Sequence, residues 1–178
     1  PKWPFDKFGY ANRTLGTQMK ATGEVMAIER SLEASLLKAV RSLEIGRYGL
    51  YQTQFNKLSD VELKEKLLEV NDNRLFIIAE AMRRDMTLNE IQKITEISSF
   101  FLHKIKNIIK CEKELSKLSI DDLKESKKLL KKAKKIGFSD SEIALLTKCD
   151  ERDVKKIRNK LKLKPVYKMV DTCAAEFS

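Results

Sequence analysis

Residues 87–109, TLNEIQKITEISSFFLHKIKNII, and residues 139–161, SDSEIALLTKCDERDVKKIRNKL, show one pattern when the chain is shifted by 52 positions. Each segment begins with threonine or serine, has an acid three residues later, and then repeats apolar residues at helical spacing. The matched positions include Ile91 with Ile143, Leu102 with Val154, and Ile105 with Ile157. Two copies of one helical packing unit require such a match. The sequence therefore predicts an all-α bundle of two related three-helix units stacked on each other.

Helix boundaries are also visible in the sequence. A capping box puts serine or threonine before a helix and an acid three residues later, and each side chain bonds the other residue's N–H. The pattern occurs at Ser59…Glu62, Thr87…Glu90, Ser119…Asp122 and Ser139…Glu142. Asp150 is a further candidate N-cap, and Gly137 stands where a left-handed residue would end a lysine-rich helix. Apolar spacing predicts another amphipathic helix over residues 31–44.

Composition excludes several protein classes. The 178 residues include six Gly and three Pro, too few for the many turns of a β-sandwich or barrel. An apolar fraction of 42% excludes wholesale disorder. No apolar run approaches the ~18 residues that cross a bilayer, so we expect no membrane partner. The first residue is Pro1 rather than Met, and we expect a processed product or a piece of a longer protein.

The two ends differ from the helical middle. Residues 1 to about 23 hold most of the glycines and prolines together with four aromatic residues, which predicts irregular chain. Pro165 stops the last helix, and the β-prone residues that follow it predict an extended segment.

The residues that carry chemistry do not assemble into an active site in the sequence. Cys111, Cys149 and Cys173 lie far apart without a C-x-x-C pair, so we expect three buried apolar thiols, reduced in a cytoplasm, and no metal site. His103 is the only histidine and lies among apolar residues. Phosphate-binding glycine loops are absent. We therefore predict no catalytic, cofactor or metal residues in this chain.

The formal charge of +10 raises nucleic acid as an alternative partner. Residues 139–163 resemble a helix-turn-helix with a basic second helix. The repeat argues against this reading, because Phe100 and Phe101 occupy the positions of Arg152 and Asp153 in the first copy. Exposed aromatic residues suit a protein contact better than a phosphate backbone, so we interpret Phe100 and Phe101 as a candidate oligomer interface. The seven lysines between Lys124 and Lys135 are interpreted as a solvated face.

Both ends of the chain resemble one enzyme family. Residues 164–177, KPVYKMVDTCAAEF, resemble the segment of the carbamoyl phosphate synthetase large subunit that joins its helical oligomerisation domain to its second ATP-grasp half. FDKF at residues 5–8 and TQMKATGEVMAI at residues 17–28 resemble the end of the first ATP-grasp half. Residues 74–81, RLFIIAEA, and Phe101-Leu102 resemble the helical domain between them.

The resemblance implies a domain division and a parent activity. Residues 1–46 would end the first ATP-grasp half, residues 47–164 would form the oligomerisation domain, and residues 165–178 would lead into the second half. The parent would be a cytoplasmic ligase that makes carbamoyl phosphate from bicarbonate, ammonia or glutamine and two ATP, for arginine and pyrimidine biosynthesis. Its ATP and Mg²⁺ would bind outside this piece, which would itself be inactive.

The resemblance also implies partners and a tunnel. The partners would be other domains of the same large subunit, a glutaminase small subunit, and further copies bound through the helical domain, with no nucleic acid. Val25 and Met26 would line the tunnel that carries carbamate between the two halves.

Overall fold

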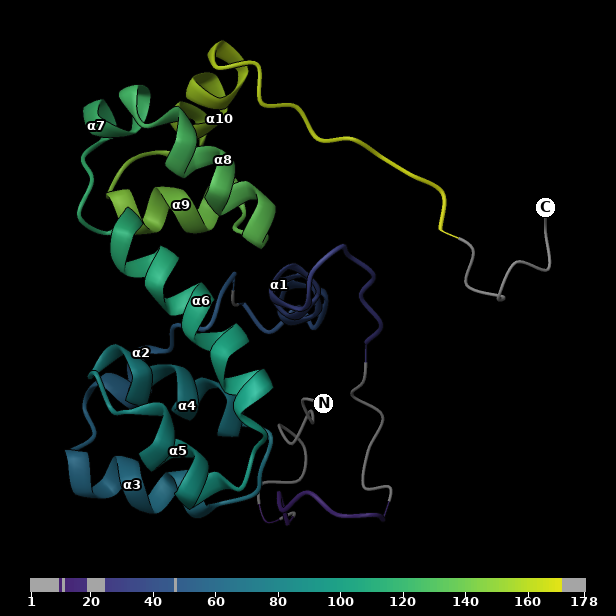
Figure 1. Cartoon of the computed structure of the whole chain (residues 1–178), viewed down its shortest axis with the longest axis vertical. Coiled ribbons are helices and arrows are strands. Elements are labelled where there is room, and N and C mark those ends of the chain that lie inside the picture. Colours follow the sequence, from purple (N-terminus) through teal and green to yellow (C-terminus); the bar gives the residue numbers. More distant parts are fainter. Residues whose placement is uncertain (1–9, 11, 19–24, 47, 171–178) are drawn as a thin grey trace.

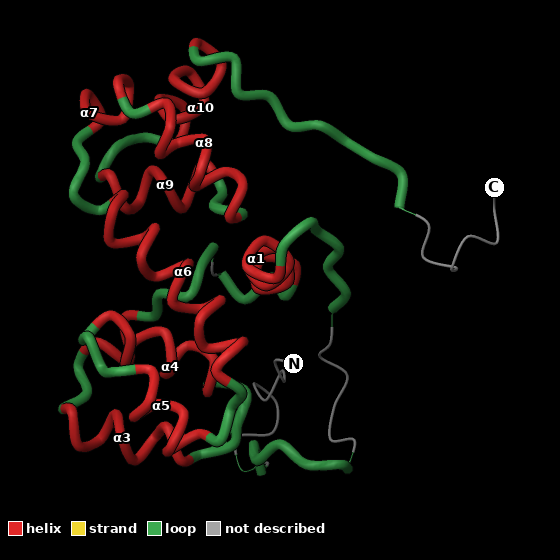
Figure 2. Tube along the Cα trace, viewed as in Figure 1, coloured by secondary structure: helices red, strands yellow, loops and turns green. Residues whose placement is uncertain are grey.

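The structure is a computed structural model that describes residues 10, 12–18, 25–46 and 48–170. Within these residues the chain forms ten α-helices and no β-strand (Figure 2), which confirms the predicted all-α class. The sequence motif at residues 5–8, residues 19–24 of the motif at 17–28, and residues 171–177 with Cys173 lie outside the described residues. The helices are α1 (Leu32–Ser42), α2 (Thr53–Asn56), α3 (Asp60–Leu68), α4 (Arg74–Arg83), α5 (Leu88–Thr95), α6 (Ser99–Leu115), α7 (Ile120–Glu125), α8 (Lys127–Ile136), α9 (Asp140–Thr147) and α10 (Glu151–Lys160).

The two predicted units are present as stacked groups of helices. Helices α3, α4 and α5 gather at one end of the molecule, and α7, α8, α9 and α10 gather at the other (Figure 1). The offset of 52 residues carries both ends of α5 onto both ends of α9, and it carries the first residue of α6 onto the first residue of α10. The sequence repeat is therefore a repeat of helix boundaries as well as of apolar positions.

Matched hydrogen bonds show that the two copies share local geometry. Buried Thr95 at the end of α5 donates its hydroxyl to the carbonyl of Ile91 at 2.7 Å, and buried Thr147 in α9 donates to Ile143 at 2.8 Å. The residue after each helix has positive φ, 57° at Glu96 and 53° at Lys148. Each copy thus ends its middle helix with a left-handed residue that turns the chain toward the next helix.

Helix α6 connects the two units. It packs against α4 and α5 of the first unit and against α8 and α9 of the second (Figure 1). Helix α1 also packs against α6, and Asn107 donates a hydrogen bond to Glu33 of α1 at 2.9 Å. The buried apolar side chains of α6 are Leu102, Ile105, Ile108, Ile109, Cys111 and Leu115.

Three of the four predicted capping boxes are complete. The side chains of Ser59, Thr87 and Ser119 and their acids exchange the expected hydrogen bonds. At the fourth, Ser139 accepts from the backbone N–H of Glu142, but the reciprocal half of the box is not formed. Asp150 caps α10 as predicted, and Gly137 ends α8 with φ of 107°.

The described ends of the chain are irregular and extended, as predicted. Arg13 ties the N-terminal segment to the turn before α4 by donating to the carboxylate of Asp72, at 3.0 Å from Nε and at 2.8 Å and 2.6 Å from Nη2. A backbone bond of 2.6 Å from Leu15 to Val70 lies beside it. Residues 164–170 leave the helices as an extended strip (Figure 1), in which Tyr167 is 92% exposed.

Gly137 should be the glycine that stability requires most. A Cβ built on it would lie 2.8 Å from the Cα of Ala34 in α1, and its φ of 107° already disfavours a side chain. We expect Gly137→Ala to lower the free energy of unfolding by about 2–4 kcal/mol, because backbone strain and overpacking add. Urea denaturation would measure the loss.

Two matched glycines separate these causes. Gly46 has φ of 69° but open space around its Cβ position, so Gly46→Ala should cost only about 1 kcal/mol. Gly16 has open space and no positive φ, so Gly16→Ala should leave stability unchanged or slightly raised. Equal losses in Gly46→Ala and Gly137→Ala would show that the contact with Ala34 contributes nothing.

Candidate functional site

The described residues contain no constellation for metal or nucleophilic chemistry. No group of three or more potential metal-ligating residues lies together in the described part of the chain. His103 is exposed on α6, and its Nδ1 lies 2.7 Å from the carbonyl oxygen of Ser99. None of the described helices is long and apolar enough to cross a membrane.

The cysteines differ from one another. Cys111 is buried, and burial raises the pKa of its thiol to about 11, so that it stays protonated and unreactive. Cys149 is only half-buried, with its Sγ 3.1 Å from the hydroxyl oxygen of Thr147. The prediction of buried cysteines is therefore confirmed for Cys111 and corrected for Cys149, which lies just after α9 at the edge of the core.

A buried ion-pair network lies where α4 meets α6. Arg83 forms two hydrogen bonds to the carboxylate of Glu112, of 2.5 Å and 2.9 Å, and a weaker one of 3.3 Å to Glu80. Burial opposes the charge of Arg83, but its hydrogen bonds and its attraction to Glu112 hold its pKa above the ordinary value. The two side chains are only 12% and 10% exposed, so their charges depend on each other rather than on water.

A pocket of about 450 Å³ lies next to this network. Its walls come from the connection between α1 and α2 together with the first residue of α2, from helix α6, and from helix α9. Its lining includes two aromatic, two acidic and two aliphatic side chains: Tyr48, Tyr51, Glu112, Glu142, Leu145 and Leu146. The pocket therefore lies at the junction of the two units, beside the helix that joins them.

Glu142 is the unusual residue of this pocket. It is only 5% exposed, and within the described part of the chain its buried Oε2 has no hydrogen-bond partner. Burial raises the pKa of Glu142 to about 8, and the nearby charge of Glu112 acts in the same direction, while Arg41 opposes it. The sequence pattern predicts a capping box at Glu142 and carries no signal of the pocket, because residues 46–53, which form one wall of it, lie outside the repeat. The backbone N–H of Ser139 still acts to lower the pKa of Glu142, but burial raises it by more.

Phe100 and Phe101 lie side by side at the start of α6 and are 55% and 48% exposed. Their ring centroids are 5.3 Å apart with an interplanar angle of 81°, an edge-to-face pair. The ammonium of Lys104 lies 5.4 Å from the centroid of Phe100. Val25 and Met26 lie in the irregular segment before α1, with exposures of 38% and 79%.

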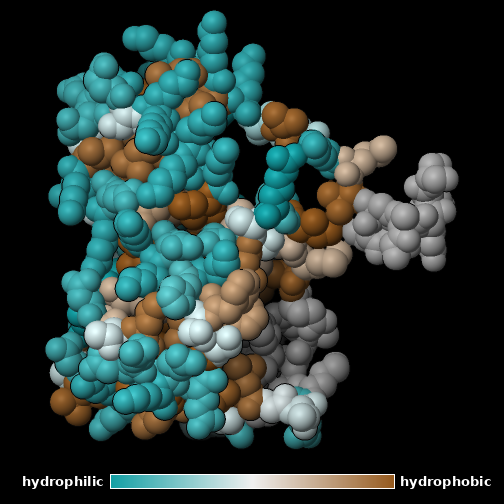
Figure 3. All heavy atoms as spheres, viewed as in Figure 1, coloured by the Kyte–Doolittle hydropathy of each residue, from teal (hydrophilic) through white to brown (hydrophobic). Residues whose placement is uncertain are grey.

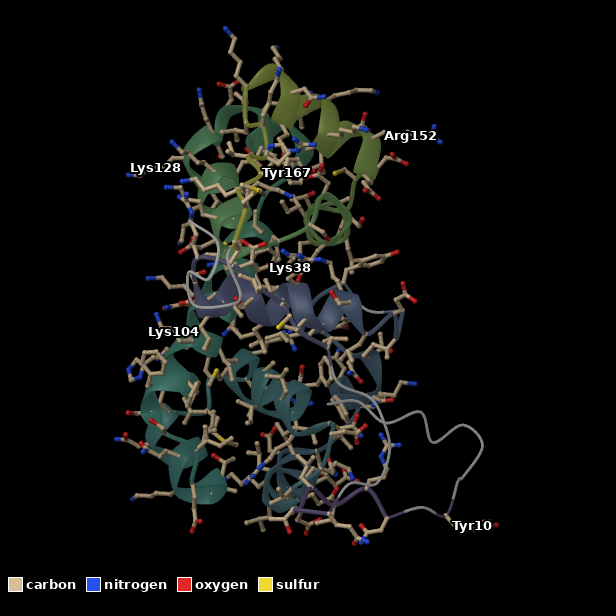
Figure 4. The ribbon with its side chains drawn as sticks, turned by 90° about the vertical axis from the view of Figure 1, so that its right-hand side faces the viewer. Tyr10, Lys38, Lys104, Lys128, Arg152 and Tyr167 are labelled. Carbon is tan, nitrogen blue, oxygen red and sulfur yellow. The ribbon has the colours of Figure 1, made fainter. Side chains whose placement is uncertain are left out.

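The basic surface of the second unit is largely solvated. In Figure 4 Lys128 and Arg152 point outward from opposite sides of this unit. Arg158 of α10 instead binds within the protein, to Asp140 at 3.1 Å and to the carbonyl of Leu163 at 3.0 Å. The space-filling view shows hydrophilic side chains over most of the visible surface of the second unit (Figure 3). At least one basic side chain of the second helix of this helix-turn-helix-like segment therefore holds α10 in place.

Comparisons with known proteins agree with one another. Residues 24–162 match the family described as carbamoyl-phosphate synthetase large chain, oligomerisation domain. The carbamoyl phosphate synthase large chain of Caldanaerobacter subterraneus subsp. tengcongensis is 54% identical over 177 residues. Those of Thermoanaerobacter sp. (strain X514) and Thermoanaerobacter pseudethanolicus are each 52% identical over 177 residues.

The alignments cover 99% of this chain but only 16% of each relative. The chain therefore spans about one sixth of the length of these relatives. The same matches give no support to the DNA-binding alternative.

Glu142 should make stability depend on pH. The folded state keeps a proton on Glu142 up to a pKa of about 8, whereas the unfolded chain releases it near the ordinary value of 4.5. Between these values the folded state binds more protons, so the free energy of unfolding falls as pH rises. We expect the fall to be on the order of a few kcal/mol between about pH 5 and pH 8. Urea titrations at several pH values would measure it.

The matched control is the equivalent acid of the first unit. Glu142→Gln should flatten the pH dependence, because glutamine imitates the protonated acid. Glu90→Gln should leave it in place, since Glu90 is exposed and its capping hydrogen bonds lower its pKa. A Glu142→Gln variant that keeps the full slope would assign the effect to another group.

Glu112 should be costly to remove. In Glu112→Ala the guanidinium of Arg83 stays buried and loses its two strongest hydrogen bonds. We expect stability to fall by about 3–5 kcal/mol, as when one partner of a buried pair is deleted. The exposed pair of Asp121 with Lys124 is the control, and Asp121→Ala should cost far less than Glu112→Ala, because water already solvates both charges. Thermal denaturation of both variants would show whether the two losses differ.

Proposed function

Since the chain belongs to the family of carbamoyl-phosphate synthetase large chains, as their oligomerisation domain, we propose that it connects the two ATP-grasp halves of such an enzyme and supplies a contact between subunits. The observation that carries this proposal is the junction at α6, where one helix is buried against two helical units and begins with an exposed aromatic pair. A rigid spacer and an outward apolar contact are what a connecting domain needs.

The proposal places the chemistry outside this chain. The parent would join bicarbonate and ammonia or glutamine-derived nitrogen at the cost of two ATP, for arginine and pyrimidine biosynthesis. ATP and Mg²⁺ would bind to the ATP-grasp halves. The protonated Cys111 and the exposed His103, whose Nδ1 lies 2.7 Å from the carbonyl oxygen of Ser99, support a structural rather than a catalytic part for this chain.

The domain boundaries and the tunnel belong to the same proposal. Residues 1–46 would end the first ATP-grasp half, residues 47–164 would be the oligomerisation domain, and residues 165–178 would enter the second half. The hydrogen bonds of Arg13 to Asp72 support a fixed position of residues 12–18 against the helical domain. Val25 and Met26 would line the carbamate tunnel, and their exposure supports a position that further polypeptide covers.

The partners follow from this placement. Other domains of the same large subunit would surround the chain, and a glutaminase small subunit would belong to the same cytoplasmic enzyme. The extended strip of residues 164–170, with Val166 82% and Met169 101% exposed, supports a neighbouring domain on that side. A second copy of the chain would dock at Phe100 and Phe101.

Replacing the aromatic pair should weaken self-association. Stable interfaces bury more than about 1,000 Å², so two phenylalanines can form only the centre of the contact. We expect the unchanged chain to form a dimer, and Phe100→Ser with Phe101→Ser to raise the dissociation constant at least about tenfold through loss of buried apolar area. Size exclusion with light scattering over a range of concentrations would measure the constant.

Val61 provides the control for a nonspecific effect of exposed apolar residues. It is 68% exposed at the start of α3, beside Asp60, which pairs with Arg84 at the end of α4 remote from Phe100. Val61→Ser should leave the dissociation constant unchanged. A chain that remains monomeric at high concentration would count against the interface, and equal weakening by Val61→Ser would move the contact from α6 to a broader surface.

A further inference from the structure

The pocket at the junction of the two units contains a carboxylate without a counter-ion of its own. Glu142 reaches it from α9 and Glu112 reaches it from α6. Both oxygens of Glu112 are already bound to Arg83. The Oε2 of Glu142 has no hydrogen-bond partner among the described residues. Two acids thus line one pocket, and only one of them is paired there.

The backbone around Glu142 is shaped to admit its carboxylate. A Cβ built on Gly49 would lie 2.6 Å from the Cδ of Glu142, closer than real Cβ contacts come. Gly49 is itself buried, so the connection between α1 and α2 passes directly over the acid. A larger residue at this position would have to push the end of the Glu142 side chain aside, so the close approach of Gly49 leaves the carboxylate its present place in the pocket wall.

The charged groups that face Glu142 do not neutralise it completely. Glu112 repels it from α6, whereas Arg41 of α1 and Arg83 of α4 attract it. Arg41 is bound to the carbonyl of Gly137 at 2.9 Å, and Arg83 is bound to Glu112. The two guanidinium groups act on Glu142 from a distance and leave its buried oxygen without a hydrogen bond.

The remaining walls suit an apolar stem that carries positive charge. Leu145 and Leu146 provide aliphatic surface, and Tyr48 and Tyr51 provide aromatic rings. Aromatic faces attract cations, and Arg83 already lies 5.3 Å from the centroid of Tyr51. Tyr48 also lines the pocket and is 55% exposed, so its ring is accessible to a ligand from solvent.

We propose that this pocket binds an alkylammonium or alkylguanidinium group, whose apolar stem lies between the tyrosines and leucines and whose charge pairs with Glu142. The cation meets the carboxylate of Glu142 from the side that lines the pocket, and not at Oε2, which is buried. It also replaces the proton of the neutral acid, which leaves to the solvent. This inference does not rest on the proposed oligomeric role, because the pocket is formed within one chain.

Binding should therefore depend on pH in a defined direction. Glu142 must lose a proton to pair with the cation, and with a pKa of about 8 it is mostly protonated at neutral pH. An alkylammonium ion keeps its own charge to about pH 10. Affinity should rise about tenfold between about pH 7 and pH 9, because the ionised fraction of Glu142 rises by that factor.

The test uses n-butylammonium chloride as the probe and 1-butanol as a neutral probe of the same shape. Calorimetry in two buffers of different ionisation enthalpy would measure affinity and proton release. The proposal expects saturable butylammonium binding, release of up to one proton at neutral pH, and no comparable butanol binding. Glu142→Gln should abolish binding, and Glu90→Gln, the equivalent change in the first unit, should preserve it.

Several results would overturn the proposal. These are no saturable binding up to about 50 mM probe, equal binding of butanol, equal binding by Glu142→Gln, or an affinity that does not change with pH. If Glu142→Gln fails to fold, the butanol comparison and the pH dependence still decide. Loss of self-association in the Phe100 and Phe101 variants with intact butylammonium binding would separate this site from the proposed interface.

The source of the cation can be a free amine or a lysine or arginine side chain of further polypeptide. The same titration on the whole natural gene product that contains these residues distinguishes them. If the natural ligand is a free amine, butylammonium should also bind to the whole gene product. If a side chain of the further polypeptide already occupies the pocket, butylammonium should not bind to the whole gene product, and Glu142→Gln should not restore its binding.

Discussion

Helix α6 must bury apolar side chains against two units at once, and this constraint governs the rest of the structure. A surface helix normally buries one stripe, whereas α6 packs against α1, α4, α5, α8 and α9. Each fully buried leucine or isoleucine contributes roughly 1.5–3 kcal/mol relative to an exposed one. Leu102, Ile108 and Leu115 are fully buried along the length of α6, so the helix packs tightly into both units and fixes the distance between them.

That burial has an electrostatic consequence at the end of α6 nearest the second unit. Glu112 is largely buried, so its charge is stabilised mainly by a partner within the protein, and Arg83 of the first unit provides that partner. The second unit then brings Glu142 to the same region without bringing another cation into contact with it. The raised pKa of Glu142 follows from its burial and from the charge on Glu112 that α6 requires. The pocket is thus a product of joining two units through one helix.

The sequence contained the local rules of this fold but not its long-range polar contacts. Thr87 and Glu90 predict a helix start because their capping hydrogen bonds join residues only three positions apart. The repeat at 52 positions predicts the second unit because equivalent apolar positions are buried in both copies. Arginine contacts carry no such local signal. Arg84 donates to the carbonyls of Phe55 and Leu58 at 3.0 Å and 2.7 Å, across more than twenty positions of sequence. Its partners follow from how α2 meets α4, which no spacing rule specifies.

Glu142 shows how the two copies acquired different chemistry from one pattern. In the first unit Glu90 is exposed, and its carboxylate accepts a hydrogen bond from the backbone N–H of Thr87. In the second unit the connection between α1 and α2, which has no counterpart in the repeat, passes over the same position with Gly49 against the acid. This connection excludes water from the carboxylate of Glu142, which lies in the wall of the pocket. Its capping box with Ser139 is not complete, as the box of Thr87 with Glu90 is. The connection between α1 and α2 therefore gives Glu142 surroundings that Glu90 lacks, although both acids occupy the same position in the repeat. This difference makes Glu142 a candidate binding residue.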